Sequence, residues 1–402
     1  MHRRADMSSK LHEFIIFLRN FACDGVMSLL PRSDTSVGSM PSILLVRLDA
    51  IGDFVLWLNA AKDLRRLYPP DRYRLVLLGN SIWAELAAHL PYFDEVVPVE
   101  CNLLHYNLTY RIKLWQLLRS RAWAVAIQPN FSRDGNCGDA VVRVSGAVER
   151  IGSEGDLSNQ PKWHRWFSNR WYTRLLPVAS EPRMELERNA EFMRNLGVQD
   201  FVAGLSELAI HATVPPGFNA CDYCVVVPGA SLPLKQWPVD KYAELCERIH
   251  TTTGLTVIIC GSKSEAELGA RLLDMTTGGR GGWMEDWTGK STILELVAVI
   301  QCAKMLIGND SGAVHIAAAV GTQAFCVVGG GHFGRFIPYK VDDNVAGCLP
   351  VAIFHTLGCY GCNLKCTKIL RKDSDTDTCV TLVTVEDVWK KIKVLCVEHH
   401  SA

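Results

Sequence analysis

The sequence predicts an α/β protein built from two doubly wound parallel sheets. Short aliphatic and β-branched runs alternate with amphipathic segments over residues 43–127, and the same alternation restarts over residues 223–328. Strands that alternate with helices in this way are typical of parallel sheets covered on both faces. Between the two stretches, residues 198–220 lack strong periodicity and contain Pro215 and Pro216, which indicates a connection between domains. The length of 402 residues fits two domains.

This prediction rests on the order in which strands and helices are expected along the chain. The expected strands are residues 43–47, 74–78, 96–99, 123–127, 223–227, 255–260, 304–307 and 323–328. The first expected helix begins after Gly52 and ends at about residue 68. The other expected helices cover residues 108–120, 183–196, 239–250, 264–273, 292–301, 312–320 and 385–395. Ligands of such sheets bind at the carboxyl ends of the strands, and we expect the largest cleft between the two domains.

Composition excludes several classes of protein. Lys plus Arg and Asp plus Glu both number 42, so no net charge favours nucleic acid as a partner. No apolar run is long enough for a transmembrane helix, and the apolar run 14–18 is too short and too closely flanked by charges for a signal peptide. The 15 cysteines are odd in number and partly lie in strand-like runs. This pattern favours a reducing cytoplasm over a secreted disulfide framework.

Residues 1–41 form an N-terminal extension that ends in a polar linker. Within it, Leu11, Phe14, Ile15, Leu18 and Ala22 fall on one face of an expected helix. With the neighbouring basic residues, this helix is suited to a peripheral contact with an anionic membrane surface. The alternative is a helix that packs on its own protein or on a second subunit of a homo-oligomer. The sequence leaves both open.

The loop after the first strand contains a candidate general base. Gly52 permits a tight turn there, and Asp53 stands at the start of the following helix. A carboxylate at this place is either a helix N-cap or a base that faces the cleft. Asp49, four residues earlier, is the alternative base. No GxGxxG motif follows the strand, which argues against a dinucleotide site.

The second half contains two loops suited to an anion. After the strand at 223–227, Ser231 offers a hydroxyl group and Lys235 a point charge that suits a phosphate, although a plain surface lysine is the alternative. After the strand at 304–307, Ser311 and Gly312 begin a helix whose N-terminus can bind a diphosphate. His315 lies one turn further on. Asp310 is suited either to sugar hydroxyls or to a helix cap.

Four motifs together resemble glycosyltransferase family 9, the ADP-heptose:lipopolysaccharide heptosyltransferases and their relatives. They are VRLDAIGD (46–53), VPGASLPLKQWP (227–238), ICGSKSE (259–265) and GNDSGAVHIAAAVGT (308–322). The resemblance implies the GT-B fold: two Rossmann-like domains that face a central cleft. It implies an acceptor-binding domain over residues 42–205 and a nucleotide-sugar domain over 206–345. It also implies transfer of a heptose from an ADP-sugar with inversion, with no metal needed for catalysis.

The resemblance assigns roles to single residues. Asp53 matches the catalytic base, and Lys235 matches the lysine on the donor phosphates. Glu265 matches the acidic residue that contacts the nucleoside. The donor-binding turn is matched by Asp310, Ser311, Gly312 and His315. Ala313 replaces the Pro or Leu that usually follows the glycine.

The acceptor is less evident from the sequence. Trp163, Trp166 and Trp171 lie among basic residues within 161–174, and Arg133 follows an expected strand end. Aromatic faces stack on sugars and arginine binds phosphate, so a glycan, glycolipid or protein acceptor is expected here unless the segment is simply packed. Two other functions compete with glycosyl transfer: a non-hydrolysing sugar-nucleotide epimerase of related shape, and a non-catalytic metal-binding protein on the same scaffold.

The C-terminal segment, residues 346–402, contains a cluster of cysteines before its closing helix. The cluster comprises Cys359, Cys362, Cys366 and Cys379. Four closely spaced thiols favour tetrahedral zinc or iron. By resemblance, a four-cysteine iron centre occurs in relatives that modify autotransporter adhesins. The sequence therefore predicts a structural Fe or Zn ion in this segment, away from the donor site.

Overall fold

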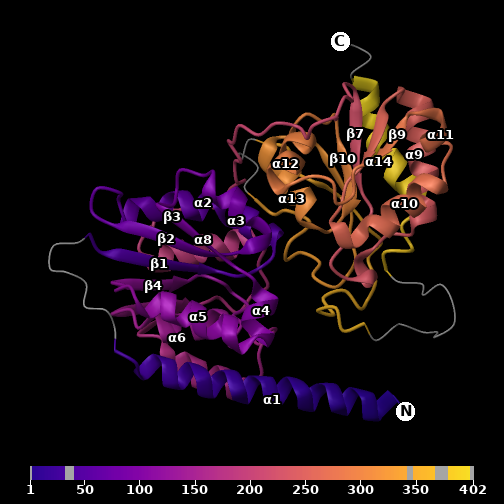
Figure 1. Ribbon diagram of the computed structural model, residues 1–402. Coiled ribbons are helices and arrows are strands. Elements are labelled where there is room, and N and C mark those ends of the chain that lie inside the picture. The colour runs from indigo at the N-terminus through magenta and orange to yellow at the C-terminus, as the bar shows by residue number, and fades with distance from the viewer. Residues whose placement is uncertain (1, 32–39, 342–346, 367–378, 399–402) are drawn as a thin grey trace. The chain divides into compact units, whose positions relative to one another are not determined.

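The computed structural model describes residues 2–31, 40–341, 347–366 and 379–398, and the chain divides into two compact units. Unit 1 comprises Met1–Ala50, Ala60–Ser180 and Arg188–Val202. Unit 2 comprises Ile51–Asn59, Glu181–Glu187 and Ala203–Ala402. Each unit contains one six-stranded sheet, and every strand pairing in both sheets is parallel (Figure 1).

The sheet of unit 1 has the order β3-β2-β1-β4-β5-β6. Its strands are β1 (Ser42–Arg47), β2 (Arg74–Asn80), β3 (Glu95–Val99), β4 (Val125–Gln128), β5 (Glu149–Ser153) and β6 (Arg174–Leu176). The helices in this part of the chain are α1 (His2–Leu29), α2 (Ile51–Leu67), α3 (Ser81–Ala88), α4 (Cys101–Tyr106), α5 (Leu108–Arg119), α6 (Gly138–Ser145), α7 (Lys162–Ser168), the 3₁₀ turn η1 (Asn169–Trp171) and α8 (Glu185–Leu196). β1 lies in the middle of the sheet, and its side chains are buried from Ile43 onward.

The sheet of unit 2 has the order β12-β11-β10-β7-β8-β9. Its strands are β7 (Tyr223–Val227), β8 (Thr256–Ile259), β9 (Met284–Asp286), β10 (Leu306–Asn309), β11 (Ala324–Val327) and β12 (Val351–Ile353). The helices in this part are η2 (Pro233–Lys235), α9 (Val239–Thr253), η3 (Lys263–Glu265), α10 (Ala266–Asp274), α11 (Gly278–Gly281), α12 (Ile293–Gln301), α13 (Gly312–Val320) and α14 (Val385–Glu398).

The two sheets have the same topology. Counted along the chain within each unit, both follow the order 3-2-1-4-5-6. This is the doubly wound order whose ligand site lies where the strand order reverses, at β1 and β4 in unit 1 and at β7 and β10 in unit 2. The predicted fold class is confirmed. All of the expected strands are present, and the strands that were not expected are β5, β6, β9 and β12.

The C-terminal segment packs into the core of unit 2. Val388, Trp389 and Ile392 of α14 are buried in one cluster with residues of β7, β8 and α9. The Trp237 indole donates a hydrogen bond of 2.9 Å to the carbonyl oxygen of Val383, just before α14. The closing helix expected over residues 385–395 is thus present as α14.

Helix α1 packs beside α5 and α6 of its own unit with a mixed face, on which Ile16, Asn20, Asp24 and Met27 are buried (Figure 1). Asp24 is 2 % exposed and accepts two hydrogen bonds from Arg111, at 2.7 and 2.6 Å, and one from Trp115. The apolar residues that the sequence places on one face, Phe14, Ile15 and Leu18, are exposed instead. Among the described residues, no helix is both long enough and apolar enough to span a bilayer.

Candidate functional site

The candidate donor site lies at the carboxyl ends of β7 and β10, where the strand order of unit 2 reverses. β7 leads into the loop that contains Lys235, and β10 leads into Asp310 and the start of α13. The side chain of Asn309, at the end of β10, joins the two loops. Its amide donates to the carbonyl oxygen of Pro228 at 2.8 Å, and its oxygen accepts from the backbone N–H of Trp237 at 2.9 Å.

Lys235 and Asp310 form an ion pair at this edge of the sheet. The Lys235 Nζ atom lies 2.8 Å from Asp310 Oδ2, and the two side chains are 15 % and 10 % exposed. Asp310 therefore neutralises the lysine charge in the protein without ligand. Because both side chains retain contact with solvent, a phosphate can reach the ammonium group without unfolding of the loop.

The N-terminus of α13 adds donors for an anion. Ser311 is the N-cap residue, yet its side chain makes no capping hydrogen bond. Its Oγ atom is buried and has no hydrogen-bond partner among the described residues. A buried hydroxyl group without a partner costs about 1–3 kcal/mol, and a ligand oxygen would remove this cost. The backbone N–H groups of the first turn and the helix dipole favour the same ligand charge.

His315 is buried behind this turn and remains neutral. Burial lowers the pKa of its imidazole to about 4, with a smaller opposing effect from the nearby Asp310. The Nδ1 atom lies 2.7 Å from the Tyr339 hydroxyl group, and the two rings stack with centroids 5.7 Å apart. Tyr339 thus holds the orientation of the imidazole ring. A neutral imidazole can position α13 or a ligand, but it adds no charge for a diphosphate.

Glu265 begins α10 and lies beside Gly229. The carboxylate accepts hydrogen bonds of 2.7 Å from the Ser262 N–H group and 2.8 Å from its hydroxyl group, as part of a capping box. A Cβ atom at Gly229 would lie 1.8 Å from Glu265 Oε1, so glycine is required here. Ser231 lies on the same loop as Gly229 and is exposed.

Asp53 lies in the first turn of α2, within the segment Ile51–Asn59 that belongs to unit 2. The N-cap of α2 is Ala50, so the N-cap interpretation of Asp53 is wrong. Two glycines bring the turn before Asp53 against α13. A Cβ atom on Gly52 would lie 2.8 Å from His315 Cδ2, and one on Gly312 would lie 2.3 Å from Ile51 Cγ2. Gly52, the residue before Asp53, therefore lies against the start of α13.

Asp49 is held in a salt bridge. Its Oδ2 atom lies 2.5 Å from Arg47 Nη2 and accepts a hydrogen bond of 3.1 Å from the Asn130 amide. Arg47 is 1 % exposed, so the pair is largely buried. A carboxylate that neutralises a buried guanidinium group is less available to remove a proton. The geometry favours Asp53 over Asp49 as the base.

The segment expected to bind the acceptor forms a surface of unit 1. In α7, Trp163 and Trp166 are 46 % and 55 % exposed, and a cavity of about 600 Å³ lies beside the helix. The cavity is lined by Gly155, Asp156, Leu157, Lys162, Arg165, Trp166 and Asn169. Arg133, in contrast, is buried against Asp139 and Tyr172. The expectation that Arg133 faces an acceptor is wrong, because its guanidinium group is buried in unit 1 in an ion pair with Asp139.

The four predicted metal ligands are described, and none forms a disulfide. Cys379 Sγ accepts a hydrogen bond of 3.1 Å from the Gly330 N–H group, and the Gly330 carbonyl oxygen accepts one of 2.8 Å from Gly361. Cys379 and the CxxC segment therefore contact the same loop. Within the described ranges, no group of three or more His, Cys, Asp or Glu side chains comes close enough together to hold a metal ion.

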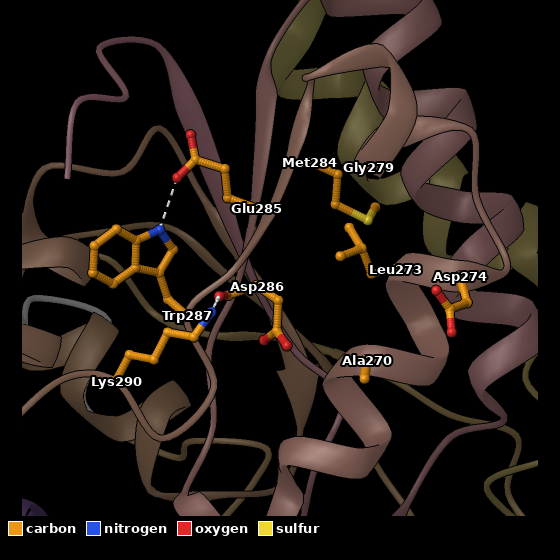
Figure 2. Close-up of a pocket in the computed structure, with 9 residues that line it drawn as sticks. All are labelled: Ala270, Leu273, Asp274, Gly279, Met284, Glu285, Asp286, Trp287 and Lys290. Atoms are coloured by element: carbon orange, nitrogen blue, oxygen red, sulfur yellow. Dashed lines mark hydrogen bonds between the residues drawn. The ribbon is translucent and has the colours of Figure 1, made fainter. Parts of the chain in front are cut away.

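A second cavity, of about 540 Å³, lies along the edge strand β9 of unit 2. Figure 2 shows the side chains that line it, which include the Trp287 indole donating to Glu285 at 2.8 Å. None of the predicted donor-binding residues lines this cavity.

Comparisons with known proteins agree with this geometry. A family model described as glycosyltransferase family 9 (heptosyltransferase) matches residues 141–351. Lipopolysaccharide heptosyltransferase 3 of Escherichia coli is 31 % identical over 297 residues, which cover 69 % of this chain and 80 % of that protein. Lipopolysaccharide heptosyltransferase 2 of Salmonella typhimurium is 33 % identical over 94 residues, or 23 % of this chain. That match spans only 27 % of the relative's own length.

Solved structures show the same fold at lower identity. The E. coli ADP-heptose lps heptosyltransferase II matches with a TM-score of 0.64 and 20 % identity, over 89 % of this chain and 99 % of that chain. The iron-containing dodecameric glycosyltransferase TibC of enterotoxigenic E. coli matches with a TM-score of 0.54 and 16 % identity, over 93 % and 81 %. The family model, the E. coli relative and the two doubly wound sheets lead to one conclusion: this chain belongs to glycosyltransferase family 9, the heptosyltransferases.

Proposed function

We propose that this chain transfers a heptose from ADP-heptose, with inversion, to a hydroxyl group of a lipopolysaccharide-core, other glycan or protein acceptor. One observation carries the proposal: Lys235, Asp310 and the Ser311 hydroxyl group converge at the topological switch point of unit 2. A diphosphate ligand would pair with the lysine and fill the hydrogen-bonding capacity of Ser311 and the first turn of α13.

The proposed reaction assigns one task to each group. The Asp53 carboxylate removes the proton of the acceptor hydroxyl group, and the resulting oxygen attacks the anomeric carbon of the heptose from the face opposite to the diphosphate. The bond between the anomeric carbon and the diphosphate oxygen breaks, and ADP leaves. Lys235 and the N-terminus of α13 stabilise the negative charge that develops on the departing diphosphate. In this proposal, the positive charge of Lys235 and of the α13 N-terminus takes the place of a metal ion, so no catalytic metal is needed.

The acceptor binds, in this proposal, beside α7 in unit 1. Lys162 and Arg165 supply positive charge to the cavity there, and Trp166 supplies an exposed aromatic face. A sugar stacks on such a face, and an anionic substituent on the sugar or its carrier would pair with the cations. We place the reaction in the cytoplasm, because an odd number of cysteines, several of them in strand-like runs, suits a reducing compartment.

A donor screen tests the proposed function. Isothermal titration calorimetry with ADP-, UDP- and GDP-sugars on the full chain should give measurable binding for ADP-heptose and at least tenfold weaker binding for the others. Each sugar nucleotide is paired with its own nucleoside diphosphate as a control for recognition of the sugar. Equal affinity for all three bases, or no binding of any, would contradict the assigned donor.

We also propose that Cys359, Cys362, Cys366 and Cys379 bind a structural zinc or iron ion. Four thiols are the donor set that these ions prefer, and two segments of the cluster already contact Gly330. The bound ion would tie the CxxC segment to the end of the loop before α14. TibC is iron-containing, so both metals are to be measured.

Elemental analysis of protein purified without chelator tests the metal. About one Zn or Fe per chain is expected, with loss of metal and a lower melting temperature in Cys359→Ser and Cys379→Ser. Cys302→Ser, at an exposed cysteine outside the cluster, is the matched control and should keep both. Metal-free protein with unchanged melting in both cluster variants would rule out the site.

A further inference from the structure

Helix α1 presents an apolar stripe to solvent, in addition to the mixed side that it packs on the protein. Ile15, Leu18, Val26 and Leu29 are 55, 49, 63 and 86 % exposed, and Ala22 between them is exposed as well. These five residues are called the outer face of α1. An ordinary surface helix keeps its apolar residues toward the core and presents a polar side to solvent. Exposed apolar stripes of this size mark interaction surfaces.

The outer face is a continuous stripe of a straight helix. Its five members are spaced 3, 4, 4 and 3 residues apart. At 3.6 residues per turn this spacing keeps them on one side over about 20 Å of helix length. No charged residue lies on the stripe, and the residue at its centre, Ala22, is small. A second helix can therefore approach its backbone closely.

Buried polar contacts hold α1 so that this stripe stays outside. The bidentate pair of Asp24 with Arg111 is almost fully buried, with side chains 3 % and 0 % exposed. Asn20 donates to the carbonyl oxygen of His105 at 2.9 Å and to Asn136 at 3.2 Å. A rotation of α1 that hid the apolar residues would expose these groups and break their hydrogen bonds. The surface is thus formed before any partner binds.

We propose that the outer face of α1 is a self-association surface, which pairs with the outer face of α1 in a second copy of this chain. The same stripe on both copies is complementary to itself, as a two-fold interface requires. With Phe14 at its margin, 47 % exposed, the stripe offers roughly 500 Å² per copy. A pair then buries about 1,000 Å², which reaches the lower limit for a specific interface.

Charge argues for a protein partner over a lipid surface. A helix that lies on an anionic bilayer is rich in lysine and arginine on the polar face that borders its apolar stripe. The basic residues Arg3, Arg4 and Lys10 of α1 all precede the outer face. Over residues 15–29, Arg19 is the only lysine or arginine, and its guanidinium group donates to Asn20 and to the carbonyl oxygens of His105 and Tyr106. This charge is directed toward the protein. The stripe therefore lacks the electrostatic part of a membrane contact.

Sedimentation velocity of the full chain over a range of concentrations tests this assignment. The wild-type chain should associate reversibly, and Leu18→Glu combined with Val26→Glu should weaken the association at least 100-fold. Val148→Glu is the matched control, because Val148 is 75 % exposed in unit 1 and is not part of the outer face. All variants should keep the wild-type circular dichroism spectrum, since no substituted side chain is buried.

Two results would overturn the proposal. One is a wild-type chain that remains monomeric at every concentration. The other is a double variant that assembles as the wild type does. Flotation with vesicles that contain phosphatidylglycerol tests a lipid partner. If the wild-type protein is monomeric and floats with the vesicles, while the double variant does not float, the outer face binds lipid instead. Association that the double variant loses, without flotation of the wild type, supports the pairing.

Discussion

The two sheets share one strand order, yet their switch points differ in chemistry. In unit 1, Asp49 at the ends of β1 and β4 binds both Arg47, which is 1 % exposed, and the Asn130 amide. In unit 2 the ends of β7 and β10 carry the partly exposed pair of Lys235 and Asp310, and beside it the Ser311 hydroxyl group without a described partner. The same topology thus supports a carboxylate paired with a buried arginine in one sheet and the proposed anion site in the other, so function follows the side chains at the strand ends.

The strongest test of this difference concerns the two carboxylates after β1. Asp53→Asn should lower transfer about 10²–10⁴-fold, because only the proton acceptor is removed. Binding of ADP, measured by calorimetry, should stay within about twofold of the wild type. Asp49→Asn is the matched control: it weakens the pair with Arg47 and should lower the melting temperature more than it lowers the rate per folded molecule. Transfer by Asp53→Asn within tenfold of wild type would reassign the base to Asp49.

Removal of the Lys235 side chain, the cationic member of the ion pair in unit 2, should have the next largest effect. Lys235→Ala should weaken binding of ADP about 10–100-fold, since a charge-assisted contact with phosphate is worth about 1.5–3 kcal/mol. Binding of adenosine should hardly change, because it has no phosphate. Lys304→Ala removes a lysine that forms an exposed pair with Asp222 and should leave both affinities unchanged. Equal losses for ADP and adenosine would show that Lys235 supports the loop only.

The smallest effect concerns the buried imidazole behind the donor turn. The pKa of His315 falls from an ordinary value of 6.5 to about 4 on folding, so the unfolded chain binds more protons between these values. Stability should therefore be fully present above about pH 6.5 and decrease as the pH falls toward 4, by at most about 3 kcal/mol. Urea unfolding of wild type and His315→Gln at pH 7 and pH 5 measures this. The variant should lose less stability over that interval; equal losses would mean that His315 is not the group that titrates.

The local hydrophobic pattern was sufficient to predict the strands in the middle of each sheet, but it did not predict several strands nearer the sheet edges. The strands around each switch point contain buried aliphatic residues, as in SILLVR at β1 and YCVVV at β7, and were all expected. The unexpected strands have more polar sequences, such as ERIGS at β5 and MED at β9, or only three residues, such as RLL at β6 and VAI at β12. Such segments become strands only because a neighbouring strand offers hydrogen bonds, and no local pattern records the neighbour.

The same limit applies to the site. Asn309 was part of a recognised motif, but nothing local indicates that its amide joins the loop after β10 to the loop after β7. Arg133 follows a strand end just as Asp310 does, yet it is buried against Asp139. Position along the chain showed which residues stand at strand ends. The packing of each loop decided which of them remain accessible.

By itself, the sequence determined the two doubly wound sheets, the order of their central strands and the identity of the donor motifs, because alternating hydrophobicity and strand-end residues are local properties. Only the tertiary structure decided that Asp49 is held by Arg47, that His315 is buried and neutral, and that α1 turns its apolar face outward. Each of these depends on a partner distant along the chain. For α1 those partners include Arg111, whose buried pair with Asp24 lies on the same side of the helix as the buried Ile16 and Met27.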